Sequence, residues 1–277
     1  MTTADWRAAN RANWDERVPV HLNAPGYDPG PLRAGRRRLD PIVETELGPV
    51  EGLSVLHLQC HFGLDTLALA QRGATVVGLD FSALAIAAAR AMADELGLAG
   101  RARFVEADLY DAPLAVPEPH AFDRVFTTWG TVTWLPDIRA WARVVAGFLK
   151  PGGALYYADA HPAAQVFDDL TPLPDGRPGY FVPYFQREPV VLDDPSDYAD
   201  ASARLRHARQ YNWMHPVASI VTALIDAGLR LDFLHEHDAV AWRMFKALVA
   251  GADGLYRWPD KPWLPLALSL RAVRPRA

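Results

Sequence analysis

A regular alternation of short apolar runs and helical segments begins near residue 54 and constrains the fold more than any other feature of the chain. Strands are expected at 55–58, 75–79, 103–107, 122–127 and 154–158, and helices between them at 64–72, 82–96 and 138–148. Strands that alternate with helices form a parallel sheet with helices on both faces. The sequence therefore predicts an α/β fold with a doubly wound, mostly parallel sheet.

The segments that flank this alternation differ from it. The first fifty residues hold repeated prolines and glycines between two expected helices, at 4–17 and 33–47, and are interpreted as an extension packed on the core. Residues 161–213 are rich in proline and aromatic side chains, which indicates an inserted lid with short strands around 180–192 and 203–213. A helix at 217–227 and strands at 229–235 and 264–272, one of which could run antiparallel, bring the sheet to seven strands. We expect a single domain over 1–277, divided at 1–50, 51–160, 161–213 and 214–277.

Composition excludes several classes of protein. Half of the 277 residues are hydrophobic, enough for a substantial core, and the net charge of −5 provides no overall basic surface for nucleic acid. One cysteine cannot form an internal disulfide, no apolar run is long enough for a membrane span, and the first residues do not form an export signal. We therefore expect a cytoplasmic protein that binds neither membrane nor nucleic acid. A homodimer is compatible with the sequence.

Five motifs follow one another along the alternating region. They are the strand and turn at 55–63, Gly78-Leu79-Asp80-Phe81-Ser82, Val105-Glu106-Ala107-Asp108-Leu109, Phe122-Asp123-Arg124-Val125-Phe126 and Leu149-Lys150-Pro151-Gly152-Gly153. In their order and spacing, the chain resembles the class I methyltransferases that use S-adenosylmethionine, over about 50–160 and again over 215–272. The resemblance implies a Rossmann-like sheet, S-adenosylmethionine as the cofactor, and a small molecule as the methyl acceptor.

The resemblance also assigns the cofactor contacts. Asp80, at the end of the second strand, would accept both ribose hydroxyls, because a carboxylate suits a vicinal diol. Asp108 would take the exocyclic amine of adenine, the backbone NH of Leu109 would face a ring nitrogen, and Phe81 would cover the base. Thr127, at the end of the fourth strand, belongs to the same set. The alternatives are a strand-end turn for Asp80 and a plain loop for Asp108.

The turn after the first strand departs from the family's pattern. His57 falls at the usual acidic position, Gln59 and His61 fall at the first two glycines, and only Gly63 is retained. Glycines at such positions permit positive φ and a close approach of the backbone to the cofactor. Gln59 and His61 must therefore either adopt ordinary φ or shift the methionine end of the cofactor. Cys60 is interpreted as a small core residue.

Two other functions fit parts of the pattern. An NAD-dependent oxidoreductase also places a strand, a turn and a helix before an acidic residue, but this turn lacks the G-x-G-x-x-G motif. A non-catalytic nucleoside-binding protein would account for the missing glycines. Nucleic-acid amino methyltransferases usually carry Asn or Asp, two prolines and an aromatic residue after the fourth strand. This chain has Thr127-Thr128-Trp129-Gly130 there, which favours a small acceptor.

The acceptor is expected beyond the carboxyl ends of the fourth and fifth strands, under the lid. Trp129, together with Tyr180, Tyr184 and Trp213 from the lid, would bind an aromatic or apolar molecule and present an oxygen, nitrogen or carbon atom for methylation. The same aromatic side chains could equally form the lid's own core. Trp14 is expected to fold over the cofactor with the N-terminal helix, or simply to dock that helix.

His161, just after the fifth strand, is the first candidate for a general base, because imidazole titrates near neutral pH. His215, before the helix at 217–227, is the second. A structural role is as compatible with the sequence as a catalytic one for either residue. His235 and His237 lie two apart on a strand, but no third ligand accompanies them, so no metal is expected.

Overall fold

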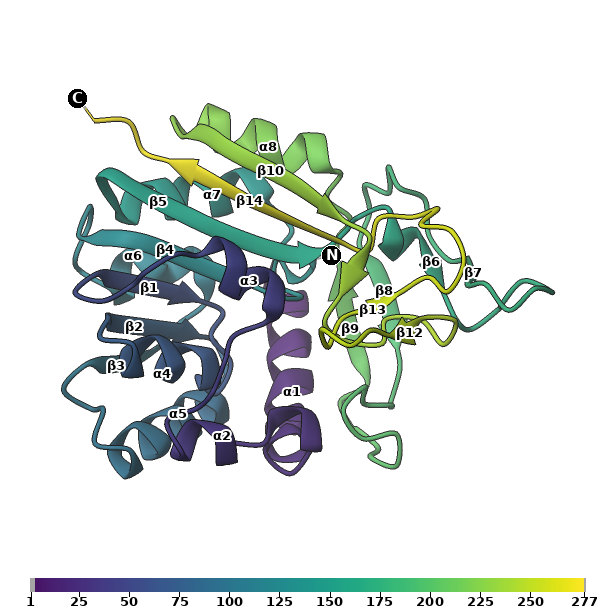
Figure 1. The fold of residues 1–277 in the computed structure, drawn as a ribbon, viewed down its shortest axis with the longest axis horizontal. Helices are drawn as coiled ribbons and strands as arrows, with labels where there is room; N and C mark the ends of the chain where they lie inside the picture. The colour runs from purple at the N-terminus through teal and green to yellow at the C-terminus, as the bar shows by residue number, and fades with distance from the viewer. Residues whose placement is uncertain (1–2, 277) are drawn as a thin grey trace.

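The central element of the computed structural model, which describes residues 3–276, is a seven-stranded sheet (Figure 1). Its strands are β1 (Ser54–Leu58), β2 (Thr75–Asp80), β3 (Ala102–Glu106), β4 (Phe122–Thr128), β5 (Leu149–Ala160), β10 (Arg230–His237) and β14 (Ala267–Val273). They lie in the order β10-β14-β5-β4-β1-β2-β3. Within the described sheet, β14 runs antiparallel to the other six strands, which share one direction. The predicted α/β class and mostly parallel sheet are confirmed.

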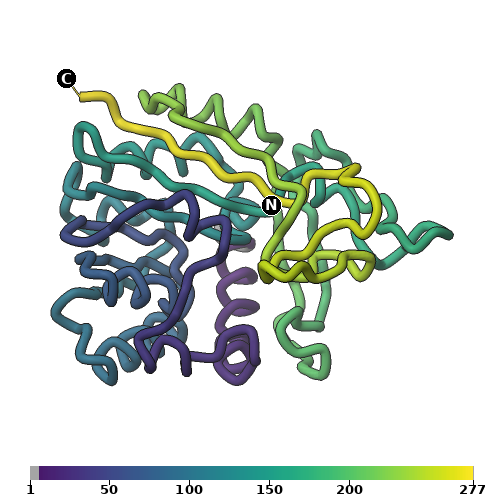
Figure 2. Tube along the Cα trace, viewed as in Figure 1, coloured from purple at the N-terminus to yellow at the C-terminus, as the bar shows by residue number. Residues whose placement is uncertain are grey.

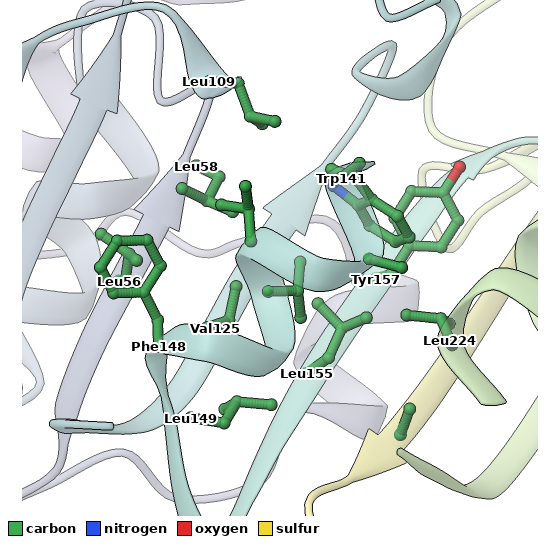
Figure 3. Close-up of a cluster of buried hydrophobic side chains, with 14 of the residues drawn as sticks. Leu56, Leu58, Leu109, Val125, Trp141, Phe148, Leu149, Leu155, Tyr157 and Leu224 are labelled. Carbon is green, nitrogen blue, oxygen red and sulfur yellow. The ribbon is translucent and has the colours of Figure 1, made fainter. Parts of the chain in front are cut away.

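Helices cover both faces of the sheet. On one face, α7 (Ile138–Phe148) and α8 (Val217–Asp226) pack on β4, β5 and β14, and Figure 3 shows Trp141 of α7 beside Tyr157 of β5 in this core. On the other face, α4 (Leu64–Gln71) and α5 (Ala83–Glu95) pack on β1, β2 and β3. Ser82 caps α5, since its hydroxyl accepts a hydrogen bond from the Ala85 NH at 3.1 Å. The turns of the core carry the short elements η2 (Leu109–Asp111), α6 (Ala112–Ala115) and η3 (Val132–Trp134).

The N-terminal extension differs from the prediction in two respects. The first helix, α1 (Thr3–Leu22), continues past Pro19 and is followed by η1 (Pro25–Tyr27). The prediction of one helix over 33–47 is wrong, because the structure has two separate helices in this region, α2 (Gly30–Arg33) and α3 (Pro41–Glu46). Gly35 ends the first piece with φ +63°, and Pro41 disfavours helical backbone in the residue before it. Asp40 instead caps α3 by accepting the Ile42 NH at 2.8 Å.

Two separate segments of the chain build the lid. The predicted insertion contains η4 (Ala164–Val166) and two antiparallel pairs, β6 (Phe167–Asp168) with β7 (Gly179–Tyr180) and β8 (Val190–Asp193) with β9 (Arg209–Asn212). The loop before β14 adds an unpredicted small sheet of β11 (Ala239–Val240), β12 (Val249–Ala250) and β13 (Tyr256–Arg257). Figure 2 shows these two stretches side by side at one end of the molecule, where they share an apolar cluster that includes Ala164, Phe245 and Trp258.

Helix α1 stands between the carboxyl ends of the parallel strands and the lid (Figure 1). It is fixed to β9 by Asn10, whose amide donates to the Tyr211 carbonyl at 2.9 Å and accepts the Tyr211 NH at 2.8 Å. This helix therefore bridges the sheet and the lid directly above the edge where a ligand of such a sheet is expected. Within residues 3–276, no helix combines the length and apolarity that a bilayer crossing requires.

Candidate functional site

A cavity of about 230 Å³ lies at the carboxyl ends of β1, β2 and β4. Its walls are the turn after β1, the end of β2, the loop that follows β4, and side chains from α1 and the lid. Eight of the residues predicted from sequence line it together, namely Trp14, Gln59, His61, Gly63, Asp80, Phe81, Leu109 and Trp129. Because open α/β sheets bind ligands at this edge, the cavity is the candidate functional site.

The substituted turn after β1 keeps the backbone shape of a glycine-rich loop. Gln59, His61 and Gly63 have φ of +56°, +52° and +80°. The alternative that Gln59 and His61 take ordinary φ is therefore wrong. A non-glycine residue in this region costs about 1–2 kcal/mol, and such strain is concentrated at functional sites. Gly63 is irreplaceable for a further reason, since a Cβ there would lie 2.6 Å from the Phe104 ring.

Three buried polar atoms in residues that line the cavity have no hydrogen-bond partner within residues 3–276. They are Trp129 Nε1, His57 Nε2 and Gln59 Oε1. The other ends of the His57 and Gln59 side chains are fixed, because His57 Nδ1 lies 2.8 Å from the Thr66 hydroxyl and Gln59 Nε2 donates to the Thr131 carbonyl at 2.9 Å. Burial lowers the pKa of His57 to about 4, so its ring is neutral at neutral pH. An unpaired buried polar atom costs about 1–3 kcal/mol, and the ammonium and carboxylate of an amino acid would satisfy His57 Nε2 and Gln59 Oε1.

Asp80 is held by the backbone around it. Its Oδ2 accepts the His61 NH at 2.8 Å, and its Oδ1 accepts the Ser82 NH at 3.0 Å. Burial raises the pKa of Asp80 to about 6, against the effect of these hydrogen bonds. Each carboxylate oxygen keeps a lone pair for one further donor. The carboxylate thus lines the cavity with capacity for two further donors, and its contact with ribose hydroxyls stays a prediction.

Helix α1 covers the part of the site that was assigned to adenine. Asp108 does not line the cavity, because its Oδ1 lies 3.2 Å from Arg7 Nη2 and accepts the Tyr110 NH at 2.9 Å. The Arg11 guanidinium lies 6.0 Å from the centre of the Phe81 ring. Arg7 and Tyr110 thus occupy Asp108 Oδ1, and a contact between Asp108 and a base stays a prediction. Thr127 is fully buried, and its neighbour Thr128 lines the cavity instead.

Neither predicted catalytic histidine lines the cavity. His161 Nε2 lies 2.9 Å from Glu236 Oε1, and its Nδ1 accepts the Ala163 NH at 3.0 Å, so both ring nitrogens are occupied. His215 Nε2 donates to the Leu135 carbonyl at 2.7 Å. Burial lowers the pKa of both histidines. Their partners and positions fit structural roles, and the candidate base has to be sought elsewhere.

The lid residues predicted to bind the acceptor also lie outside the cavity. Tyr180 is 63% exposed on β7, and the Tyr184 hydroxyl accepts the Val217 NH at 3.0 Å. Trp213 packs edge-on against Trp6 with ring centres 5.2 Å apart. Trp213 thus joins the lid to α1 and Tyr184 joins it to the start of α8, whereas the exposed Tyr180 belongs to no core within residues 3–276.

Several residues around the cavity escaped the assignment of the site from sequence. Among them, Tyr27 lines the cavity, and His21 and Asp197 lie directly behind His61. His21 and Asp197 are separated by 176 residues and come from α1 and the lid, so no local motif announces their contact. The only signal was the tyrosine and histidine content of two segments that the fold brings together.

A metal site is not evident. His235 Nδ1 and His237 Nε2 lie 2.8 Å and 3.7 Å from the same oxygen of Glu46, so these side chains connect β10 to α3. Residues 3–276 contain no group of three or more His, Cys, Asp or Glu side chains placed to hold a metal ion.

Comparison with known proteins agrees with this geometry. Residues 55–153 match the family model described as a methyltransferase domain. A ubiquinone biosynthesis O-methyltransferase of Ralstonia nicotianae is 32% identical over 130 residues, which cover 47% of this chain and 52% of that protein. The corresponding protein of Alkalilimnicola ehrlichii is 30% identical over 166 residues, which cover 59% and 62%. The chain thus spans between half and two thirds of the length of these curated relatives.

The fold is shared with solved structures. An S-adenosylmethionine-dependent methyltransferase from Mesorhizobium loti superimposes with a TM-score of 0.58 and 21% identity, over 84% of this chain and 96% of that chain. At this level of identity the likeness concerns the fold alone. It extends beyond the matched domain into the N-terminal extension or the lid, because 84% of the chain is more than residues 55–153 comprise.

Proposed function

We propose that this chain, whose residues 55–153 match the model of a methyltransferase domain, is a class I methyltransferase that transfers a methyl group from S-adenosylmethionine to a small molecule. The observation that carries the proposal is the left-handed turn after β1 together with the unpaired His57 Nε2 and Gln59 Oε1. Backbone strain and unpaired buried polar atoms both destabilise a fold, and their coincidence in one loop favours a ligand-binding role. An NAD-dependent oxidoreductase finds no such support.

Different residues of the cavity bind different parts of this cofactor. Gln59 and His57 bind the methionine end, and Asp80 accepts the ribose hydroxyls. When bound, the cofactor supplies a methyl group made reactive by the positive charge on sulfur. The protein's task is then to align the acceptor with that methyl group and to exclude water, and the rings of Trp14 and Trp134, with centroids 5.3 Å apart, support this role.

The acceptor we propose is a flat or apolar small molecule that presents an oxygen, with nitrogen and carbon as alternatives. The cavity offers aromatic faces from α1, the loop after β4 and the lid, and the matched relatives are named as O-methyltransferases. The net charge of −5 argues against a nucleic acid as the acceptor. Trp129 remains the one predicted acceptor contact that lines the cavity.

Titration calorimetry with S-adenosylhomocysteine and with NAD tests the proposal. The wild type should bind S-adenosylhomocysteine and not NAD, and Asp80→Asn should weaken binding, because it replaces a charged acceptor by a neutral amide. Asp226→Asn, an equivalent change at an exposed position of α8, is the matched control and should bind as the wild type does. Binding of NAD alone to the folded protein would refute the proposal.

Transfer of labelled methyl groups from S-adenosylmethionine to a panel of small phenols, amines and acids then tests catalysis. Steady incorporation into any of them excludes a non-catalytic nucleoside-binding protein. Tight binding of the cofactor without incorporation across the panel would favour that second function.

A further inference from the structure

We propose that His61, His21 and Asp197 form a proton relay that takes the proton of the methyl acceptor, with His61 as the catalytic residue and the other two as positioning residues. The inference rests on the proposed function and names the base that the cavity otherwise lacks. It assigns a role to three residues contributed by the turn after β1, by α1 and by the lid.

The three side chains form a continuous hydrogen-bonded line. His61 Nε2 lies 2.9 Å from His21 Nδ1, and His21 Nε2 lies 3.1 Å from Asp197 Oδ2. The line ends in a fixed carboxylate, because Asp197 also accepts from Arg17 Nη1 at 2.8 Å and from the Ala199 NH at 2.7 Å. The side chains of His21 and Asp197 are fully buried.

The partners fix the proton on each ring. Asp197, paired with Arg17, is a carboxylate and can only accept, so His21 Nε2 carries a proton. Burial lowers the pKa of His21, in spite of Asp197, so its ring is neutral and its Nδ1 is an acceptor. His61 Nε2 must therefore donate to it. Burial lowers the pKa of His61 to about 3, and its Nδ1 is consequently a free lone pair.

That lone pair belongs to a residue of the cavity wall. His61 lines the cavity, and its ring lies edge-on to Trp14 with centroids 5.3 Å apart. The hydrogen bond of the His61 ring within residues 3–276 is made by Nε2, which leaves Nδ1 for a ligand. Tyr27 stacks on His21 with ring centres 4.6 Å apart, and Tyr198 covers it at 4.9 Å, so water is kept from the middle of the line. The free end of the relay is thus its cavity end.

A buried Arg, Asp and His cluster is a poor device for stability, because the cost of desolvating the charges offsets their attraction. Such clusters in clefts are candidates for function. Here the cluster joins α1 to the lid behind the turn whose backbone is strained at His61. The strained residue is therefore the one that links the cavity to the buried carboxylate.

The proton balance of the step is complete. The acceptor oxygen forms a bond to the methyl carbon while the carbon–sulfur bond breaks, and the sulfur keeps the electron pair and loses its positive charge. The hydroxyl proton passes to His61 Nδ1, and the Nε2 proton of His61 passes to His21 Nδ1. His21 then carries the positive charge beside Asp197. One positive charge leaves the sulfur and one arrives on the relay, so the net charge of the site is unchanged.

The first test needs no turnover. Nitrogen NMR of the full chain labelled in histidine reports which ring nitrogen carries the proton. At pH 7 and without cofactor, His21 and His61 should both be neutral with the proton on Nε2, and Asp197→Asn should abolish this preference at His21. A charged His21, or a proton on Nδ1 of His61, would overturn the proposal.

The second test separates a base from a structural residue. His61→Gln suits the site, because Gln59 shows that glutamine tolerates positive φ in this turn. The matched control is His120→Gln, a histidine with φ +54° in the loop before β4, which should behave as the wild type does. S-adenosylhomocysteine should bind to both variants within about threefold of the wild type, by calorimetry.

The rate of methyl incorporation into two phenols completes the test. For a weakly acidic phenol, His61→Gln should lower kcat by about a hundredfold or more, as loss of a general base does. For a phenol already ionised at the assay pH, the loss should be less than about tenfold, because no proton needs removing. Equal losses for the two phenols, or none, would overturn the relay. If the wild type binds S-adenosylhomocysteine but methylates neither phenol, the protonation of His21 and His61 seen by NMR decides whether the relay stands. If it does not bind, the proposed function itself fails.

Discussion

Gly63→Ala should destabilise the protein far more than a change of one methyl group normally does. Gly63 has φ +80°, and a Cβ at this position would lie 2.6 Å and 2.8 Å from two atoms of the Phe104 ring and 3.2 Å from Ala89. Carbon atoms in contact prefer about 3.5–4.0 Å. The Phe104 side chain, which is only 4% exposed, must therefore move within a packed core.

Two contributions set the size of the effect. The left-handed backbone costs alanine about 1–2 kcal/mol, and the reduced freedom of the unfolded chain offsets about 0.4–1 kcal/mol of it. Displacement of Phe104 adds about 1–3 kcal/mol, the usual cost of overpacking a core. The free energy of unfolding should therefore fall by about 2–4 kcal/mol.

Gly48→Ala is the matched control. Gly48 has φ +73°, but a Cβ there would meet nothing within 4 Å, so only the backbone contribution applies. Urea denaturation of both variants, with an unchanged m value, measures the difference. Gly63→Ala should be the less stable by about 1–3 kcal/mol. Equal stability of the two variants would refute the close packing assigned to the turn after β1.

Two further predictions concern the cofactor. Binding of S-adenosylhomocysteine should weaken as the pH falls below about 6, because burial raises the pKa of Asp80 to about 6 and a protonated carboxyl is a poor hydrogen-bond acceptor. Calorimetry from pH 5 to pH 8 should show this pH dependence in the wild type and not in Asp80→Asn. Arg7→Ala should speed the association of S-adenosylhomocysteine several-fold in stopped-flow fluorescence, because Arg7 ties α1 to Asp108; the same rate in both proteins would show that α1 does not control entry. The stability cost of that change should stay within about 1 kcal/mol, since Arg7 is partly exposed.

The sheet could be predicted because its signals are local. The strands of the large sheet and the helices α4, α5, α7 and α8 each have their own periodicity, and a cap such as Ser82 lies within three residues of the NH that it accepts. The small sheet of β11, β12 and β13 could not be predicted, because strands of two residues carry no period. The break between α2 and α3 was foreseeable from Gly35 and Pro41, but the helical pattern around them outweighed these signals.

The candidate site was only partly predictable for the same reason. Asp80 is the last residue of β2 and Gly63 directly precedes α4, so the fold fixes their place. The conformation of Gln59 and His61 was left open, because whether a side chain accepts positive φ depends on the space around it. His161 satisfied the rule for a residue after a strand, yet its nitrogens are taken by Glu236 and Ala163. A contact such as that of His21 with Asp197 depends on how α1 meets the lid.

A crystal structure with S-adenosylhomocysteine tests the central claim most directly, because it shows which side chains receive each part of the cofactor. We expect the ribose hydroxyls on the Asp80 carboxylate, and the amino acid end within hydrogen-bond distance of His57 Nε2 and Gln59 Oε1. The sulfur should then face the part of the cavity lined by His61 and Trp134. A nucleoside bound elsewhere, or these two polar atoms left unpaired beside the bound cofactor, would contradict the account.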